Sequence, residues 1–163
     1  MQQQDMTAAG LWADFATPIA SADDYVRSLR GRRMTIYFMG ERVAEPADHP
    51  VIRPSINAMA ESYRLAAERP ELGSAQPAGA AHAVNRFLHV PSAPGDLVAK
   101  HEMQRELGRR TGTCFQRCVG LDAISSCHSV TFDIDAANGT DYHKRFLAFL
   151  ARAQAANVVI GGA

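Results

Sequence analysis

Apolar side chains recur with the period of an α-helix along five stretches of the chain, and residues that begin or end helices bound these stretches. Ser21, followed closely by two aspartates, is a typical N-cap, and Pro70 ends the second stretch because proline cannot continue a helix interior. The pattern predicts a mainly α protein. The predicted helices span 21–30, 51–69, 96–110, 114–136 and the segment from 140 onward.

Other parts of the chain lack the helical period. Residues 34–43 are rich in β-branched and aromatic side chains, which predicts a short β-hairpin that turns near Gly40 and Glu41. A lone hairpin is not stable in water, so we expect it to pack on the helical body or on another domain. Residues 70–80 predict a loop, and 84–90 predict a short extended or irregular segment.

The domain organisation follows from these elements. Residues 1–20 are small, Ala-rich and weakly periodic, so we expect a flexible N-terminal arm, and residues 21–163 are expected to form one helical domain. The apolar run 158–160 is followed by two glycines, a pattern typical of a chain that leads into another element. We therefore expect a helical domain with one short β-hairpin, cut at a domain boundary.

Composition supports a packed domain and argues against several classes of function. Hydrophobic residues make up 47% of the chain and charged residues 21%, which is enough apolar surface for a core. The formal net charge is +0, whereas proteins that bind nucleic acids or anionic membranes need a basic surplus. No apolar run is long enough to span a membrane, and the N-terminus lacks the pattern of a signal peptide. We expect a cytoplasmic protein.

Cys114 and Cys118 form the strongest candidate site. At positions i and i+4 of a helix they share one face, with Cβ atoms about 5–6 Å apart. This spacing suits two thiolate ligands of a zinc ion or an iron–sulfur cluster, and the break at 111–113 places Cys114 near a helix N-terminus, which favours the thiolate. The alternative is that both are buried small hydrophobic side chains. Cys127, about 13 Å further along the helix axis, is predicted to be a core cysteine.

Two further polar features leave alternatives open. Arg117, between the two cysteines, offers positive charge to an anionic substrate or cofactor, or it is a solvated surface residue. Asn85, Arg86 and His89 are polar residues in an apolar segment. Such a group indicates either a buried hydrogen-bond network or contact with a ligand.

Five separate blocks resemble, in the same order, the 4-hydroxybutyryl-CoA dehydratase/vinylacetyl-CoA Δ-isomerase family. The similarity covers roughly residues 22–163, and blocks in register are far more specific than the cysteine spacing alone. The wider superfamily includes the flavin-dependent 4-hydroxyphenylacetate 3-monooxygenases. The blocks are HPVIRPSIN at 49–57, NRF at 85–87, MQRELG at 103–108, CFQRCVGLD at 114–122 and GTDYHK at 139–144.

The resemblance implies a fold and two cofactors. Family members look like acyl-CoA dehydrogenases, with a helical N-terminal domain, a central β-domain and a C-terminal helical domain, assembled as homotetramers. This chain corresponds to the helical N-terminal domain. Family members hold FAD and a [4Fe–4S] cluster with three cysteine ligands and one histidine ligand. Cys114 and Cys118 match two of these cysteines, whereas the other two ligands and most of the FAD site match positions beyond residue 163.

The resemblance also implies a reaction. The intact enzyme acts on an acyl-CoA substrate, 4-hydroxybutyryl-CoA, and removes water through a radical route to give crotonyl-CoA. Gln116 is implied to hydrogen-bond the substrate or a cluster-bound water. Because the chain has half of the cluster ligands, we expect it to be inactive alone and to act within a homotetramer or with a complementing C-terminal chain.

Two other functions remain open. One is the N-terminal domain of a 4-hydroxyphenylacetate 3-monooxygenase-type enzyme, which uses reduced flavin and oxygen on a phenol and holds no cluster. In that family a tyrosine contacts the phenol, and Leu121 stands at the matching position here. The other is a non-catalytic helical module that pairs with a partner chain, which the abrupt C-terminus favours.

Overall fold

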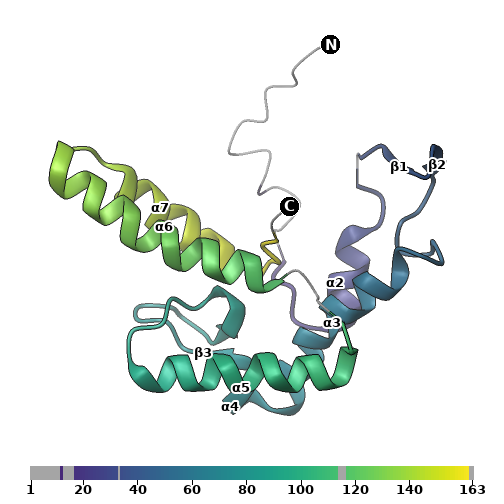
Figure 1. Ribbon diagram of the computed structural model, residues 1–163, viewed down its shortest axis with the longest axis horizontal. Helices are drawn as coiled ribbons and strands as arrows, with labels where there is room; N and C mark the ends of the chain where they lie inside the picture. Colours follow the sequence, from purple (N-terminus) through teal and green to yellow (C-terminus); the bar gives the residue numbers. More distant parts are fainter. Residues whose placement is uncertain (1–11, 13–16, 33, 114–116, 162–163) are drawn as a thin grey trace, which may run out of the picture.

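The computed structural model describes residues 12, 17–32, 34–113 and 117–161, and this part of the chain is mainly α-helical (Figure 1). The predicted fold class is therefore confirmed. The helices of the described residues are α2 (Ala22–Leu29), α3 (Arg53–Glu68), α4 (Pro70–Gly73), α5 (Pro94–Thr111), α6 (Arg117–Asn138) and α7 (Tyr142–Ala156).

Capping residues explain several helix ends. The Ser21 hydroxyl accepts a hydrogen bond from the Asp24 backbone N–H at 3.0 Å, which caps α2 as predicted. Helix α5 begins at Pro94, two residues before the predicted start, because Asp96 is its third residue and its carboxylate accepts from the Ser92 and Ala93 backbone N–H groups.

The predicted hairpin is present. Strand β1 (Ile36–Phe38) pairs antiparallel with β2 (Glu41–Val43). The two residues between them, Met39 and Gly40, have φ values of 52° and 84°, and positive φ at both central residues suits a tight hairpin turn.

A second antiparallel pair was not predicted. Strand β3 (Ser74–Ala75) pairs with β4 (Val84–Asn85), and a short 3₁₀-helix, η1 (Arg86–Leu88), follows. The prediction of a loop over 70–80 is wrong at its start, where α4 and β3 lie. Strands of two residues are too short to show the alternation that sequence patterns detect.

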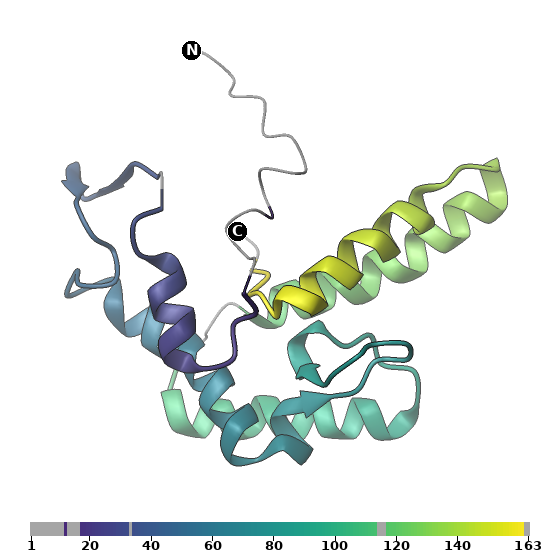
Figure 2. The same ribbon diagram turned by 180° about the vertical axis from the view of Figure 1, so that it is seen from behind.

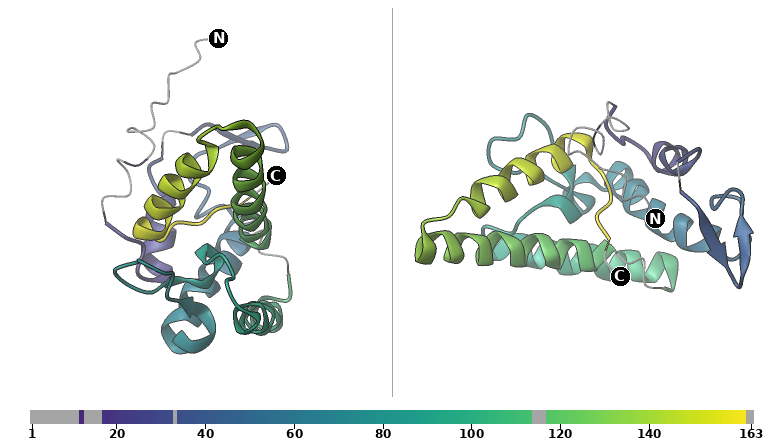
Figure 3. Two further views of the ribbon diagram at one scale, coloured as in Figure 1. Left: turned by 90° about the vertical axis from the view of Figure 1, so that its left-hand side faces the viewer. Right: turned by 90° about the horizontal axis from the view of Figure 1, so that it is seen from above.

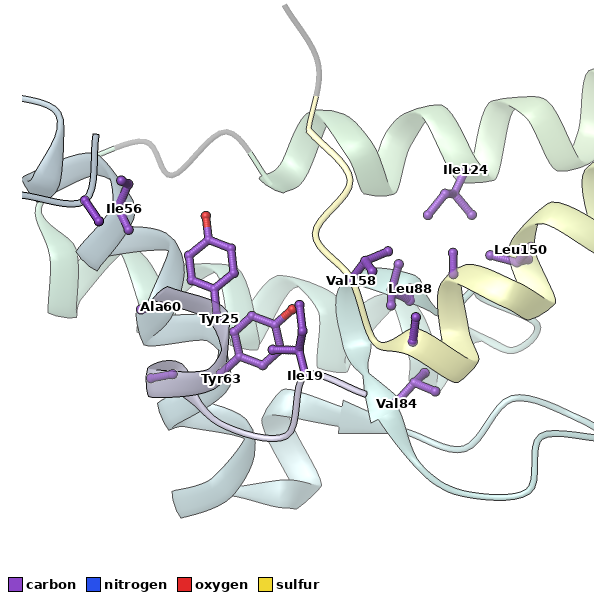
Figure 4. Packing of buried hydrophobic residues seen from close by; sticks show 14 residues of the cluster. Ile19, Tyr25, Ile56, Ala60, Tyr63, Val84, Leu88, Ile124, Leu150 and Val158 are labelled. Carbon is purple, nitrogen blue, oxygen red and sulfur yellow. The ribbon is translucent and has the colours of Figure 1, made fainter. Parts of the chain in front are cut away.

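Helix α3 lies at the centre of the packed body, with α2 on one side and α4 and α5 on the other (Figure 2). The larger of two buried clusters joins α2, α3, β4, α6 and α7 (Figure 4). It includes Ile19, within the stretch predicted to be an arm, whose backbone N–H donates to Ala156 O at 3.0 Å. The smaller cluster contains Ala58, Leu65, Leu72, Phe87, Met103, Leu107 and Leu121.

Helices α6 and α7 pack against each other and form an antiparallel pair that extends from the packed body (Figures 1 and 3). The buried residues of α6 are Arg117, Gly120, Leu121 and Ile124, all in its first half. Its second half carries exposed apolar side chains. The packed body surrounds the first turn of α6, where the candidate site lies, and leaves the second half of the helix uncovered.

Candidate functional site

The predicted cluster ligands lie at the start of α6. Cys118 is the second residue of that helix and is half-buried. Cys114 and Gln116 lie outside the described residues, so their predicted roles stay predictions. Among the residues that the structure does describe, no group of three or more His, Cys, Asp or Glu side chains is placed to hold a metal ion.

Arg117, the first residue of α6, is completely buried, with 0% of its surface exposed. Its guanidinium donates from Nη1 to Ser62 Oγ at 2.6 Å and from Nη2 to the Val158 carbonyl at 3.2 Å. The guanidinium carbon lies 4.8 Å from the Tyr63 ring centroid and 5.1 Å from that of Phe87, in cation–π contact with both. The interpretation of Arg117 as a solvated surface residue is wrong, because these groups enclose it.

Two tyrosine hydroxyls interact electrostatically with Arg117. Tyr25 stacks on Tyr63 with ring centroids 5.6 Å apart. Burial raises the pKa of the Tyr25 hydroxyl to about 12, and burial also raises the pKa of Tyr63. Burial lowers the pKa of Arg117, yet a guanidinium stays charged at neutral pH. Arg117 therefore places one positive charge beside two phenols that are neutral at pH 7.

Asn157 connects this site to three other parts of the chain. It follows α7 in the left-handed region, with φ of 51°. Its side-chain Nδ2 donates to Ile19 O at 2.7 Å, its Oδ1 accepts from the Asn85 N–H at 2.9 Å, and its carbonyl accepts from the Tyr63 hydroxyl at 2.6 Å. Sequence reasoning missed Asn157, although an asparagine directly after a helical stretch is a known C-terminal signal.

Gly120 allows the C-terminal segment to cross the first turns of α6. A Cβ atom at this position would lie 1.9 Å from the Ile160 carbonyl oxygen, far inside van der Waals contact. Gly120 was not predicted to have a functional role. A glycine inside a helical pattern is the signal that points to such a close backbone approach.

Asn85, Arg86 and His89 are buried, and the Asn85 and Arg86 side chains form a hydrogen-bond network with backbone carbonyls, as one of the two interpretations predicted. Among the described residues, His89 Nδ1 has no hydrogen-bond partner. Arg86 donates from Nε to Leu72 O at 2.7 Å and from Nη2 to Glu71 O at 3.0 Å, which satisfies carbonyls of α4. Asn85 Nδ2 donates to Ser62 O at 2.9 Å. The network fixes β4 and η1 against α3 and α4.

A cleft of about 660 Å³ lies next to this network, between α5, α6, α7 and the segment before α5. His89 Nε2 lies 3.2 Å from Asp96 Oδ2, and Lys100 Nζ lies 3.0 Å from Asp122 Oδ1. The first pair joins the segment before α5 to α5, and the second joins α5 to α6. The charged side chains of the cleft thus have structural partners.

Cys127 is exposed, so the prediction that it is a core cysteine is wrong. It lies at the middle of α6, on a part of the helix surface that the described residues leave uncovered. Within the described part of the chain, no helix is long and apolar enough to cross a membrane.

Comparisons with known proteins show which family the chain is similar to. The family model described as 4-hydroxyphenylacetate 3-hydroxylase N terminal matches residues 21–163. The chain is 39% identical over 147 residues to the 4-hydroxybutyryl-CoA dehydratase/vinylacetyl-CoA-Δ-isomerase of Clostridium aminobutyricum, a match that covers 89% of this chain and 30% of that protein.

A solved structure is similar to the same part of the chain. The oxygen-tolerant archaeal 4-hydroxybutyryl-CoA dehydratase of N. maritimus is 58% identical, with a TM-score of 0.86 over 89% of this chain and 29% of that one. The chain therefore spans under a third of the length of these two relatives.

Proposed function

Since the chain belongs to the 4-hydroxyphenylacetate 3-hydroxylase N-terminal family, we propose that it serves as the N-terminal domain of an enzyme that dehydrates 4-hydroxybutyryl-CoA and isomerises vinylacetyl-CoA. The observation that carries this proposal is the match to the archaeal dehydratase, which combines 58% identity with a TM-score of 0.86. The acyl-CoA substrate and the reaction belong to the whole enzyme.

We propose that Cys114 and Cys118 supply two ligands of a [4Fe–4S] cluster. Thiolates are the ligands such clusters require, and Cys118 lies in the first turn of α6 as the structure describes it. The adjacent Arg117 has a buried Nε without a hydrogen-bond partner and adds positive charge that suits an anionic group. The donor set thus fits half of a cluster. When bound, the cluster supplies a Lewis-acidic iron for the leaving hydroxyl.

The chain's own residues hold this helix start in place. Arg117 binds α3 and the segment after α7, and Gly120 lets that segment lie against α6. In the proposal, Gln116 hydrogen-bonds the substrate or a water between the two cysteines. FAD contacts come from further polypeptide, as the resemblance implies.

The monooxygenase is the second candidate, because the family model carries the hydroxylase name. Leu121, at the position of the phenol-contacting tyrosine in that family, is 1% exposed and packs in the smaller core cluster. An aliphatic side chain sealed into the core offers no hydrogen bond to a phenol. This observation favours the dehydratase over the monooxygenase.

The parts of α6 and α7 that extend from the packed body carry exposed apolar side chains, including Val130, Phe132 and Leu147. Exposed apolar clusters of this kind mark protein–protein contacts. We propose that this face packs against further polypeptide of the family enzyme, either a complementing C-terminal chain or another subunit of a homotetramer. A cytoplasmic location stays a prediction.

Iron binding tests the proposal. The chain is reconstituted without oxygen with ferrous iron, sulfide and a small thiol that completes the ligand set. We expect a brown protein whose iron is lost in Cys114→Ser and in Cys118→Ser, since each removes one thiolate. Iron and labile sulfide per chain are measured.

Cys127→Ser is the matched control, because Cys127 is an exposed cysteine on the same helix. It should keep the iron of the unmodified chain. Full iron in Cys118→Ser, or equal loss in all three variants, would contradict the assignment. The reaction itself is tested by adding the remaining family polypeptide with FAD and 4-hydroxybutyryl-CoA, and phenol hydroxylation instead would select the second candidate.

A further inference from the structure

Among the residues that the structure describes, no carboxylate forms an ion pair with the buried charge of Arg117. Its two hydrogen-bond acceptors, the Ser62 hydroxyl and the Val158 carbonyl, are neutral, and its Nε has no partner. None of the ion pairs among the described residues includes it. Removing an ion from water is costly unless an opposite charge compensates it. Cation–π contact with the aromatic faces of Tyr63 and Phe87 reduces this cost but does not neutralise the charge.

Arg86 shows how the same fold treats another buried arginine. Arg86 is 8% exposed, satisfies two carbonyls of α4, and lies in the electrostatic field of the Asp96 carboxylate. Its role is explained by the contacts within the chain. The contacts of Arg117 leave one nitrogen unsatisfied and one full charge uncompensated, so they do not explain why an arginine rather than a long apolar side chain occupies the site.

The position of Arg117 in the sequence indicates where the missing negative charge arises. It follows Cys114 by three residues and directly precedes Cys118, so Arg117 and the half-buried Cys118 share the first turn of α6. One helical turn rises only about 5.4 Å. Thiolates and the cluster they hold are anionic, and a poorly solvated site strengthens their attraction to a nearby guanidinium.

Resting on the proposed function, we propose that Arg117 is the fixed counter-charge of the anionic cluster held by the Cys114–Cys118 block. Its hydrogen bonds to Ser62 and Val158 hold the charge at a constant place, and the charge then stabilises the thiolate-ligated state. Arg117 is thus a positioning and electrostatic residue that does not itself contact substrate.

This role has opposite consequences in the two states of the protein. Without the cluster, the charge is uncompensated, so Arg117→Met, which keeps an unbranched chain and removes the charge, should unfold at no lower urea concentration than the unmodified chain. With the cluster, the same change removes an attraction. A residue with a purely structural role would instead lower stability in both states.

The test compares the unmodified chain with Arg117→Met, Arg117→Lys and Arg86→Met after reconstitution with ferrous iron, sulfide and a small thiol. Loss of iron to a chelator and the midpoint potential of the cluster are measured. We expect Arg117→Met to lose iron about tenfold faster. We also expect the midpoint potential of the cluster to be more negative by about 59 mV, which for a one-electron couple corresponds to a tenfold change in the equilibrium constant. Arg117→Lys keeps the charge, so its rate of iron loss and its midpoint potential should stay close to those of the unmodified chain.

Arg86→Met is the control for a buried arginine outside the cysteine block. It should lower the urea midpoint of the iron-free chain and leave the potential unchanged. Equal iron retention and potential in Arg117→Met and the unmodified chain would overturn the inference, as would an Arg117→Lys variant as defective as Arg117→Met. If the unmodified chain takes up no more iron than Cys118→Ser, the proposed ligation itself fails, and the inference fails with it.

Discussion

At the scale of single residues, the start of α6 depends on side chains that face one another from distant parts of the sequence. Arg117 meets Ser62, 55 residues earlier, and Asn157 meets Ile19, 138 residues earlier. The cysteine spacing and the family blocks identified this turn from the sequence. The partners of Arg117 could not be predicted, because nothing in a local pattern distinguishes an arginine enclosed by Tyr63 and Phe87 from one in water.

The Tyr25 hydroxyl gives this core a measurable dependence on alkaline pH. Burial raises its pKa from 10.0 to about 12, so the folded state disfavours the phenolate. A group whose pKa is raised on folding contributes stability below its unfolded pKa, near 10, and that contribution disappears as pH rises toward 12. Tyr25→Phe removes the ionisable group. The free energy of unfolding of the unmodified chain should fall between pH 8 and pH 12. We expect the corresponding fall in Tyr25→Phe to be smaller by about 1–2 kcal/mol.

Urea unfolding at several pH values measures this difference, and tyrosinate absorbance on the same samples locates the titration. The comparison at pH 8 is the internal control, where only the weak contact of the hydroxyl with Met59 Sδ, at 3.0 Å, is lost. Parallel pH profiles for the two proteins would show that Tyr25 is not the group that loses stability.

At the scale of elements, the long periodic helices and the β1–β2 hairpin were predictable, whereas α4 and the two-residue strands β3 and β4 were not. Helix α3 begins at Arg53 and ends at Glu68, within two residues of the predicted ends, because proline and the apolar period mark it locally. Strands β3 and β4 have two residues each and exist because η1 and α4 hold them together. Tertiary contacts of this kind leave no periodic signal in the sequence.

Two helix glycines give a matched test of how the C-terminal segment packs on α6. Gly120→Ala places a Cβ atom 1.9 Å from Ile160 O, which forces the segment away from the helix. Gly108→Ala, inside α5, meets no atom within 4 Å. We expect Gly120→Ala to destabilise the chain by about 2 kcal/mol or more, as overpacking does. Gly108→Ala should stabilise it by about 0.5–1 kcal/mol, since alanine favours the helix.

The free energies of unfolding in urea are compared for the three proteins. Because both substitutions make the same chemical change in a helix, the difference between them isolates the contact with Ile160. Equal stabilisation by the two alanines would show that the segment does not lie on α6 in solution.

At the scale of the whole molecule, a packed body holds the first half of α6, and the second half extends from it with α7 (Figure 3). The sequence predicted both helices but not this division, because their apolar residues continue at helical spacing to the far end. Val130 and Phe132 are 52% and 60% exposed, whereas Leu121 and Ile124 are buried. The periodicity indicates which face is apolar, and only the fold shows where that face is covered.

This division predicts a gradient of hydrogen exchange along one helix. Local opening is easiest where few buried apolar contacts hold a segment. Amides of residues 130–138 should exchange about tenfold faster or more than those of 121–126, a difference in opening free energy of about 1.4 kcal/mol. The Asp135 carboxylate, which accepts from the Tyr142 and His143 N–H groups at 2.9 and 2.8 Å, keeps the two helices joined, so exchange should be faster but not unprotected.

Mass spectrometry of peptic fragments measures this gradient, with α3 as the reference for slow exchange. Asp135→Asn weakens the connection and should accelerate 130–138 and the first turn of α7, leaving α3 unchanged. Binding of the remaining family polypeptide should slow exchange in 130–138, because the exposed side chains there would then be buried. Uniform protection along α6 in the isolated chain would contradict the division, and unchanged exchange in the complex would contradict the proposed contact face.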